Sequence, residues 1–316
     1  MVESKHQWKA WLYLAPALIL LLVFTVWPIF STVRIAFLDG YKVSGALSGT
    51  KYNFGIENFK IVIGLPGFLA SLKNTLLLTL VTVPLSTIIA LLIAVCLNSI
   101  KPLNRLLQTI YFLPYVTNSI AIGMVFNAMF NVINSDGMMG INNTPYSVGI
   151  FNQILQLFGA TPIDWINNNS TWTTNFIVMV IYIVWNALPF KILILLGGLQ
   201  SVNKQYYDAA KIDGTSRART LWRITVPMLS PMIAYVVITG FIGGFKEYSS
   251  VVGVFGDDMR APTKLDHESM STMVGLVYDY IGKKEGQAAA GALMLFVIIF
   301  IVTLINLYVS KKKVHY

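Results

Sequence analysis

Charged residues and cysteine are scarce in this sequence of 316 residues, whereas hydrophobic residues are abundant. Charged side chains make up 12% of the chain and hydrophobic ones 55%, and the mean hydropathy is +0.65. Soluble domains of this length do not have so apolar a composition. The single cysteine, Cys96, excludes a disulfide or a cysteine-based metal site within one chain. The composition therefore indicates an integral membrane protein.

Sequence patterns for catalysis and nucleotide binding are also missing. The chain has no Gly-x4-Gly-Lys-Ser/Thr loop, which would bind the phosphates of ATP. His6, His267 and His315 lie in three distant segments, so we expect no metal site. No nucleophile and base form a recognisable catalytic set, and we predict no enzyme activity and no cofactor. The net charge of +9 is not combined with a base-stacking platform, so we expect no nucleic-acid partner.

Six apolar runs are each long enough to cross a membrane as a helix. Hydrocarbon about 30 Å thick requires roughly 20 apolar residues in helical conformation. The runs cover residues 10–32, 74–97, 106–130, 174–196, 229–252 and 288–310. We predict an all-α integral membrane protein whose residues 1–316 form one transmembrane domain, in contact with membrane lipid.

The distribution of basic residues predicts the orientation of these spans. Six spans place both termini on one side, and the first run is too long for a signal peptide, so we expect it to remain as an anchor. The short segments on the side of the termini carry 12 of the 23 Lys and Arg residues, and the three much longer loops opposite carry 9. Because basic residues concentrate in cytoplasmic segments, we predict cytoplasmic termini in a bacterial cytoplasmic membrane.

A polar segment, residues 197–224, interrupts the apolar pattern between the fourth and fifth runs. Ser201 or Asn203 can cap a helix that Gly214 can end, and the helix is predicted at about 203–214. Ala209 and Ala210 leave the backbone of this helix accessible on one side. An ordinary cytosolic turn is one interpretation, and a docking site for another protein is the other. The expected docking residues are Tyr207, Asp208, Ala209, Ala210, Asp213 and Gly214.

Several short motifs resemble, in kind and order, those of the carbohydrate-type permeases of bacterial ABC importers, the maltose and multiple-sugar kind. They are Leu113-Pro114, Trp185 with Pro189, Gly197-Gly198-Leu199-Gln200-Ser201-Val202, Ile212-Asp213-Gly214, Ile224-Thr225-Val226-Pro227 and Gly286-Gln287-Ala288-Ala289-Ala290. The chain departs from the family pattern at three positions. Asp208 stands for the usual Glu, Asn203 for the usual Pro and Thr215 for the usual Ala.

This resemblance implies a type I importer fold of six transmembrane helices with a cytoplasmic coupling helix between spans 4 and 5. In that family the coupling helix inserts into a cleft on an ATPase subunit. The implied partners are a second, homologous permease, two ATPase subunits that bind ATP and Mg, and an extracytoplasmic solute-binding protein. The implied mechanism is alternating access driven by those ATPases.

The resemblance also implies a sugar-binding region in the third, fourth and fifth spans. The residues that it carries over are Ser119, Asn186, Phe190, Gly243, Gly244 and Glu247. Polar side chains of this kind can instead join helices to one another. We expect Lys191 to reach the inner membrane surface, and Glu247 either to pair with Lys246 or to contact the substrate. Because Glu247 would repel an anion unless Lys246 neutralises it, a neutral oligosaccharide is the favoured cargo.

Two other functions remain open from the sequence. The chain could be an importer permease for a non-sugar solute, such as glycerol phosphate or a polyamine. It could also be a secondary carrier or passive channel that works alone. A proton-coupled carrier requires ionisable groups near mid-membrane, and few are present in the spans.

Overall fold

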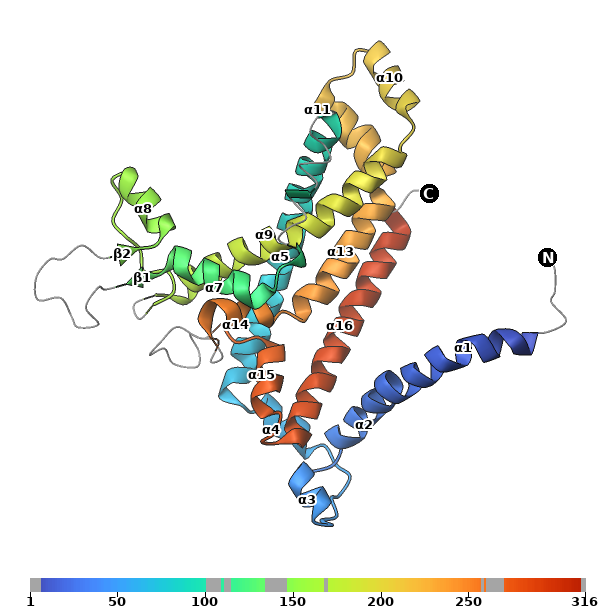
Figure 1. Ribbon diagram of the computed structural model, residues 1–316, viewed down its shortest axis with the longest axis vertical. Helices are drawn as coiled ribbons and strands as arrows, with labels where there is room; N and C mark the ends of the chain where they lie inside the picture. Colours follow the sequence, from blue (N-terminus) through green and yellow to red (C-terminus); the bar gives the residue numbers. More distant parts are fainter. Residues whose placement is uncertain are drawn as a thin grey trace, which may run out of the picture. The chain divides into compact units, whose positions relative to one another are not determined.

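The computed structural model describes residues 7–100, 109–110, 115–133, 147–167, 170–256, 259 and 270–313. Helices dominate these residues (Figure 1), where the strands β1 (Val132–Ile133) and β2 (Ser147–Val148) form one short antiparallel pair. The predicted all-α class is therefore confirmed. The chain divides into two compact units, Met1–Leu65 with Leu276–Phe296 and Pro66–Gly275 with Val297–Tyr316.

The first unit contains the N-terminal span and the beginning of the last one. Its helices are α1 (Gln7–Leu21), the π-helical turn η1 (Leu22–Val26), α2 (Trp27–Ala36), α3 (Val43–Leu47), α4 (Glu57–Ile63) and the start of α16 (Glu285–Lys313). The buried Asn58 donates through Nδ2 to the carbonyl oxygens of Ala36 (3.2 Å) and Leu38 (2.7 Å). A Cβ on Gly286 would lie 2.8 Å from Nδ2 of Asn58, so α16 begins with glycine where it meets this amide.

The second unit carries the long central helices. Its elements are α5 (Pro66–Ser99), α7 (Ser119–Phe130), α8 (Ile150–Leu157), α9 (Trp172–Ser201), α10 (Lys204–Ile212), α11 (Arg217–Thr220), the π-helical turn η2 (Leu221–Thr225), α12 (Val226–Met228), α13 (Ser230–Phe245) and α14 (Ser249–Phe255). The helix α15 (Met273–Tyr280) begins in this unit and ends in the first.

Four helices of the described chain are long and apolar enough to cross a membrane: Trp8–Ala36, Pro66–Ser99, Trp172–Ser201 and Glu285–Lys312. A fifth span exists if Arg217–Met228 and Ser230–Phe245, bent by 71° at Leu229, are taken together. These helices contain or overlap five of the predicted runs. The run 106–130 lies partly outside the described residues, and its described part is mainly the 12-residue helix α7.

The sequence predicts one helix over residues 229–252, but the structure shows a break within this run. The helix α13 ends at Phe245, and α14 starts at Ser249 after a break. The backbone N–H groups of Lys246 and Glu247 bond to the carbonyl oxygens of Gly243 and Gly244, three residues earlier, which tightens the end of α13. Glu247 therefore lies in the break between the two helices.

Buried hydroxyl groups line α5 where it meets its neighbours. The hydroxyls of Thr75, Thr79, Thr82 and Thr87 each donate to the carbonyl oxygen four residues earlier, at 2.7–2.8 Å. Bonds of this kind satisfy polar groups inside a membrane without a partner from another helix. A Cβ on Gly244 would lie 2.9 Å from Cγ2 of Thr79, so glycine permits the close contact of α13 with α5.

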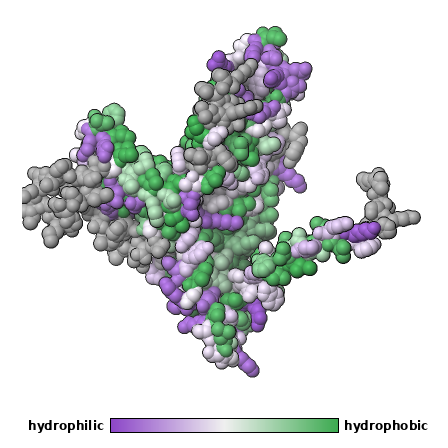
Figure 2. Space-filling view, in the orientation of Figure 1, coloured by the Kyte–Doolittle hydropathy of each residue, from purple (hydrophilic) through white to green (hydrophobic). Residues whose placement is uncertain are grey.

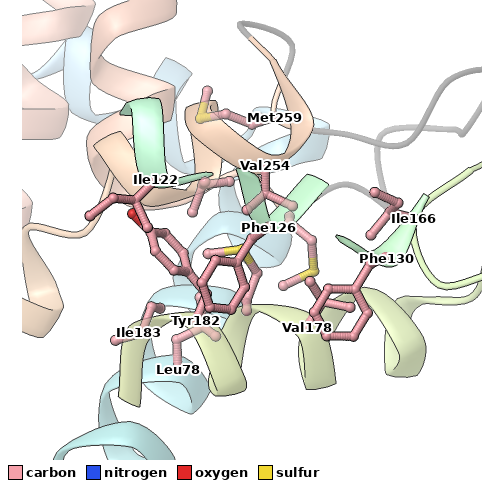
Figure 3. Close-up of a cluster of buried hydrophobic side chains, with 13 residues drawn as sticks. Leu78, Ile122, Phe126, Phe130, Ile166, Val178, Tyr182, Ile183, Val254 and Met259 are labelled. Atoms are coloured by element: carbon pink, nitrogen blue, oxygen red, sulfur yellow. The ribbon is translucent and has the colours of Figure 1, made fainter. Parts of the chain in front are cut away.

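A cluster of buried apolar side chains joins α7 to α5, α9 and α14 (Figure 3). Phe126 lies beside Tyr182, with ring centroids 4.8 Å apart, and Phe130 extends the cluster toward Ile166. The Tyr182 hydroxyl donates to the carbonyl oxygen of Ser119 at 2.6 Å. The cluster therefore fixes the first turn of α7, where Ser119 lies, against α9.

Candidate functional site

A cavity of about 310 Å³ lies within the second unit, between α5, α9, α13 and the first turn of α7. The six residues carried over from the family, Ser119, Asn186, Phe190, Gly243, Gly244 and Glu247, all line it. Asn186 and Phe190 are four residues apart on α9 and so share one face of that helix. Residues separated by more than 120 positions in the sequence are thereby brought to one cavity.

Aromatic rings form one wall of this cavity. The ring of Phe190 is stacked on that of Tyr115, with centroids 5.7 Å apart and an angle of 18° between the planes. The ring of Tyr235 of α13 is also near Phe190, with ring centroids 6.5 Å apart. Flat apolar rings beside hydroxyl and amide groups suit a sugar, which presents an apolar ring face and several hydroxyls.

Glu247 is held in place by its neighbours in the break between α13 and α14. Its Oε1 accepts hydrogen bonds from the hydroxyl and the backbone N–H of Ser250. Its backbone carbonyl accepts from Oγ1 of Thr272 at 2.7 Å. The expected ion pair between Glu247 and Lys246 is not formed. The ion pair found among the described residues joins Lys211 to Asp208, and the side chain of Lys246 is exposed.

Lys191 does not extend to the membrane surface, so the expectation that it does was wrong. Its side chain lines the cavity and is 4% exposed. The ammonium donates to the Val83 carbonyl (3.1 Å), to Oγ of Ser86 (2.7 Å) and to Oγ1 of Thr87 (3.0 Å). These oxygens of α5 accept the hydrogen bonds that a lysine at a membrane surface would donate to water or lipid headgroups.

The sequence pattern missed several other residues of the cavity wall. They include Thr82, Ser86, Tyr115, Thr239 and Gly240. The hydroxyls of α5 occur within an apolar run, where their spacing gives no sign of whether they face a cavity or another helix. Only the packing of α9 and α13 against α5 brings them to the site.

The polar segment forms the short helix α10, close to the bounds that its sequence predicts. Asn203 is the cap, since its Oδ1 accepts from the backbone N–H of Gln205 at 3.0 Å. Ser201 instead belongs to α9 and donates to the carbonyl of Gly198. Gly214 follows the helix with φ +65°, the left-handed conformation in which glycine is favoured.

The expected docking residues of α10 fall into two groups. Asp208, Ala209, Asp213 and Gly214 are exposed. Tyr207 and Ala210 face their own chain, because the Tyr207 hydroxyl lies 3.4 Å from Oγ1 of Thr225 and Ala210 is buried. The structure adds Ile212, which is 86% exposed. Hydrophilic residues gather over the region of α10 (Figure 2).

Cofactor ligands are not grouped in the part of the chain that the structure describes. No set of three or more His, Cys, Asp or Glu residues there could hold a metal ion. The three histidines and the Leu113-Pro114 motif lie outside the described residues.

Long apolar helices around a polar and aromatic cavity, with an exposed helix between two of them, define a membrane transport component. Residues 61–315 match the family described as "Binding-protein-dependent transport system inner membrane component". The chain belongs to this family. The assignment to binding-protein-dependent permeases that the motifs indicated is therefore confirmed.

Curated relatives are similar over most of their length. The arabinooligosaccharides transport system permease protein AraP of Bacillus subtilis is 29% identical over 95% of this chain and 88% of its own. The multiple sugar-binding transport system permease protein MsmF of Streptococcus mutans is 26% identical over 97% of both chains. The lactose transport system permease protein LacF of Rhizobium radiobacter is 30% identical over 77% of this chain and 74% of its own.

A solved structure shares the fold. A chain of a bacterial ABC transporter involved in the import of the acidic polysaccharide alginate superposes with a TM-score of 0.76, over 98% of this chain and 96% of that one. Its sequence identity of 19% makes this a likeness of fold alone. A bacterial alginate ABC transporter has also been solved in complex with an alginate pentasaccharide-bound periplasmic protein, with a TM-score of 0.77.

Proposed function

We propose that the chain is a permease subunit that passes a sugar or oligosaccharide across the bacterial cytoplasmic membrane by alternating access. The observation that carries this proposal is the cavity where hydroxyl, amide and carboxylate groups adjoin the stacked rings of Phe190 and Tyr115. Its volume, about 310 Å³, is at the lower end of the roughly 300–1,000 Å³ of ligand pockets and suits a small saccharide. The names of the relatives AraP, LacF and MsmF support a sugar as the cargo class.

The energy for transport comes, in this proposal, from partner subunits. Two ATPase subunits bind ATP and Mg and receive α10, while this chain holds no cofactor. The exposed Ile212 and the bare Ala209 backbone support a docking role, because an apolar side chain on a polar helix is suited to a pocket in another protein. Closure of the ATPases would move α10 and thereby open the cavity to the opposite side.

The full assembly contains a second, homologous permease and an extracytoplasmic solute-binding protein. In this arrangement the chain has six spans and cytoplasmic termini, and α7 belongs to the third span. The helix pair bent at Leu229 forms the fifth. The family description supports dependence on a binding protein.

Vesicle transport tests the proposal against a carrier that works alone. The chain is reconstituted with its partner permease, ATPases and binding protein, and uptake of labelled sugars is measured. We expect uptake to require ATP on the α10 side and the binding protein on the other. Transport by the purified chain alone would contradict the proposal, and preference for glycerol phosphate or a polyamine would retain the importer but reject the sugar.

A further inference from the structure

Lys191 places a buried amine in the wall of the cavity, and Glu247 places a carboxyl group there. We infer that Lys191 is a specificity-determining residue, which balances Glu247 so that the cavity admits uncharged polyhydroxyl compounds in preference to cations or anions. This inference rests on the proposed function for the identity of the cavity as the cargo site. It assigns to Lys191 a role in selecting cargo by charge.

The surroundings of the Lys191 ammonium are closed and contain uncharged acceptors. Three oxygens of α5 accept its three N–H groups, those of Val83, Ser86 and Thr87. A Cβ on Gly240 of α13 would lie 3.3 Å from Nζ, so the α13 backbone closes a further side. The ammonium is therefore saturated with hydrogen bonds, but these bonds do not neutralise its charge.

The hydroxyl groups of Ser86 and Thr87 on α5 do not need Lys191 as a hydrogen-bond partner. Ser86 donates to the carbonyl of Thr82, and Thr87 donates to that of Val83, so both hydroxyl protons are already used within α5. An unbranched apolar side chain of similar length, such as methionine, could occupy the same space. Burying an ammonium is unfavourable compared with burying such a side chain. What lysine adds at this position is therefore its charge.

Glu247 and Lys191 act on the cavity as two separate charges. No ion pair joins them, since the one found in the described part of the chain is Lys211–Asp208. Oε1 of Glu247 is held by Ser250, at the start of α14, away from the α5 oxygens that hold Lys191. In a site partly shielded from water, each charge acts on a ligand across the cavity. Lys191 repels a cation that Glu247 attracts, and Glu247 repels an anion that Lys191 attracts, so an ion of either sign gains little net attraction to offset its lost hydration. An uncharged sugar has no ionic hydration to lose.

The charge within the cavity can be measured with a cysteine at position 243. A Cβ on Gly243 would have no heavy atom within 4 Å, and this residue lines the cavity. The complete importer carries Gly243→Cys together with Cys96→Ala, which removes the natural cysteine. Reaction rates are then measured with three methanethiosulfonates, one cationic (trimethylammonium), one anionic (sulfonate) and one neutral (hydroxyethyl). The neutral reagent corrects for differences in access.

We expect Lys191→Met to raise the ratio of cationic to anionic reaction rates by about 100-fold, because removing one charge about 10 Å away changes each rate by about tenfold, in opposite directions, at an effective dielectric constant of about 25. Glu247→Gln should lower the ratio by a similar factor, and the double variant should return it to the starting value. Lys191→Arg, which keeps the charge, and Lys204→Met, which removes an exposed charge of α10 outside the cavity wall, should leave the ratio unchanged. An unchanged ratio in Lys191→Met, or failure of the neutral reagent to reach the introduced thiol, would overturn the inference.

The effect on cargo is measured separately, with the same binding protein throughout. Uptake of a maltotriose derivative with one amino group, and hence one positive charge, is compared with uptake of maltotriose, which is neutral. Lys191→Met should raise the ratio of the two by about tenfold, and an unchanged ratio would contradict a role in selection. Because the thiol reagents need neither sugar nor binding protein, the cavity charge can be established even if no sugar is transported and the proposed function fails.

Discussion

Replacing Gly214 with proline is expected to uncouple the chain from its ATPases. Gly214 has φ +65°, and its N–H donates to the carbonyl of Lys211 at 3.1 Å. Proline holds φ near −65° and has no N–H, so the variant loses both the conformation and the hydrogen bond that end α10. This loss destabilises the end of the helix by about 3 kcal/mol or more. We expect ATP-driven uptake to fall by about 100-fold. Co-purification of the ATPase subunits with the permease should fall in parallel.

Asparagine at the same position is the matched control. It also removes the glycine but tolerates the left-handed conformation and keeps the N–H. Gly214→Asn should therefore retain most of the uptake and of the co-purification. If the ATPases co-purified as well with Gly214→Pro as with the unaltered chain, at equal expression, α10 would not be the docking element.

Filling the cavity with Gly243→Trp is expected to have the second large effect. A Cβ at position 243 would have no heavy atom within 4 Å, so the indole could extend from it into the cavity. It would occupy volume that the cargo needs while leaving the close contacts of Gly240 and Gly244 with α5 and Lys191 intact. Because the indole takes its volume from the cargo, we expect uptake to fall by about 10- to 100-fold, which corresponds to about 1–3 kcal/mol of lost cargo binding.

Gly197→Trp controls for the loss of a helical glycine in a long apolar helix. Gly197 of α9 likewise has no heavy atom within 4 Å of a Cβ position, but it does not line the cavity. Uptake with this variant should stay close to that of the unaltered chain. Equal losses at positions 197 and 243, or none at 243, would show that the cavity is not on the cargo pathway.

Short motifs in the sequence predicted the functional class and the short helix after α9. The Asn203 cap and Gly214 are local signals, since each acts through the backbone of residues within a few positions. The six cavity residues were identified only through the resemblance of this chain to other permeases. Their position on one cavity follows from the packing of α5, α9 and α13, and their contact with cargo stays a prediction.

Lys191 shows why the rest of the site could not be predicted. Its position toward the end of an apolar run suggests a side chain that reaches the membrane surface. Its actual acceptors, Ser86 and Thr87, precede it by 105 and 104 residues. The break after Phe245 has a similar explanation, because the run 229–252 is apolar on both sides of it. Neither the bond to Thr272 nor the end of α13 is visible in local sequence.

The hydroxyls of α5 have a consequence for how the helices move. Thr75, Thr79, Thr82 and Thr87 donate to carbonyls of their own helix, and α13 meets this surface with Gly240 and Gly244. At these positions α13 can slide along α5 without exchanging one hydrogen-bond partner for another. Lys191, by contrast, fastens α9 to α5 through three bonds. The contact surfaces thus favour a motion in which α5 and α9 travel as one rigid pair and α13 shifts against them.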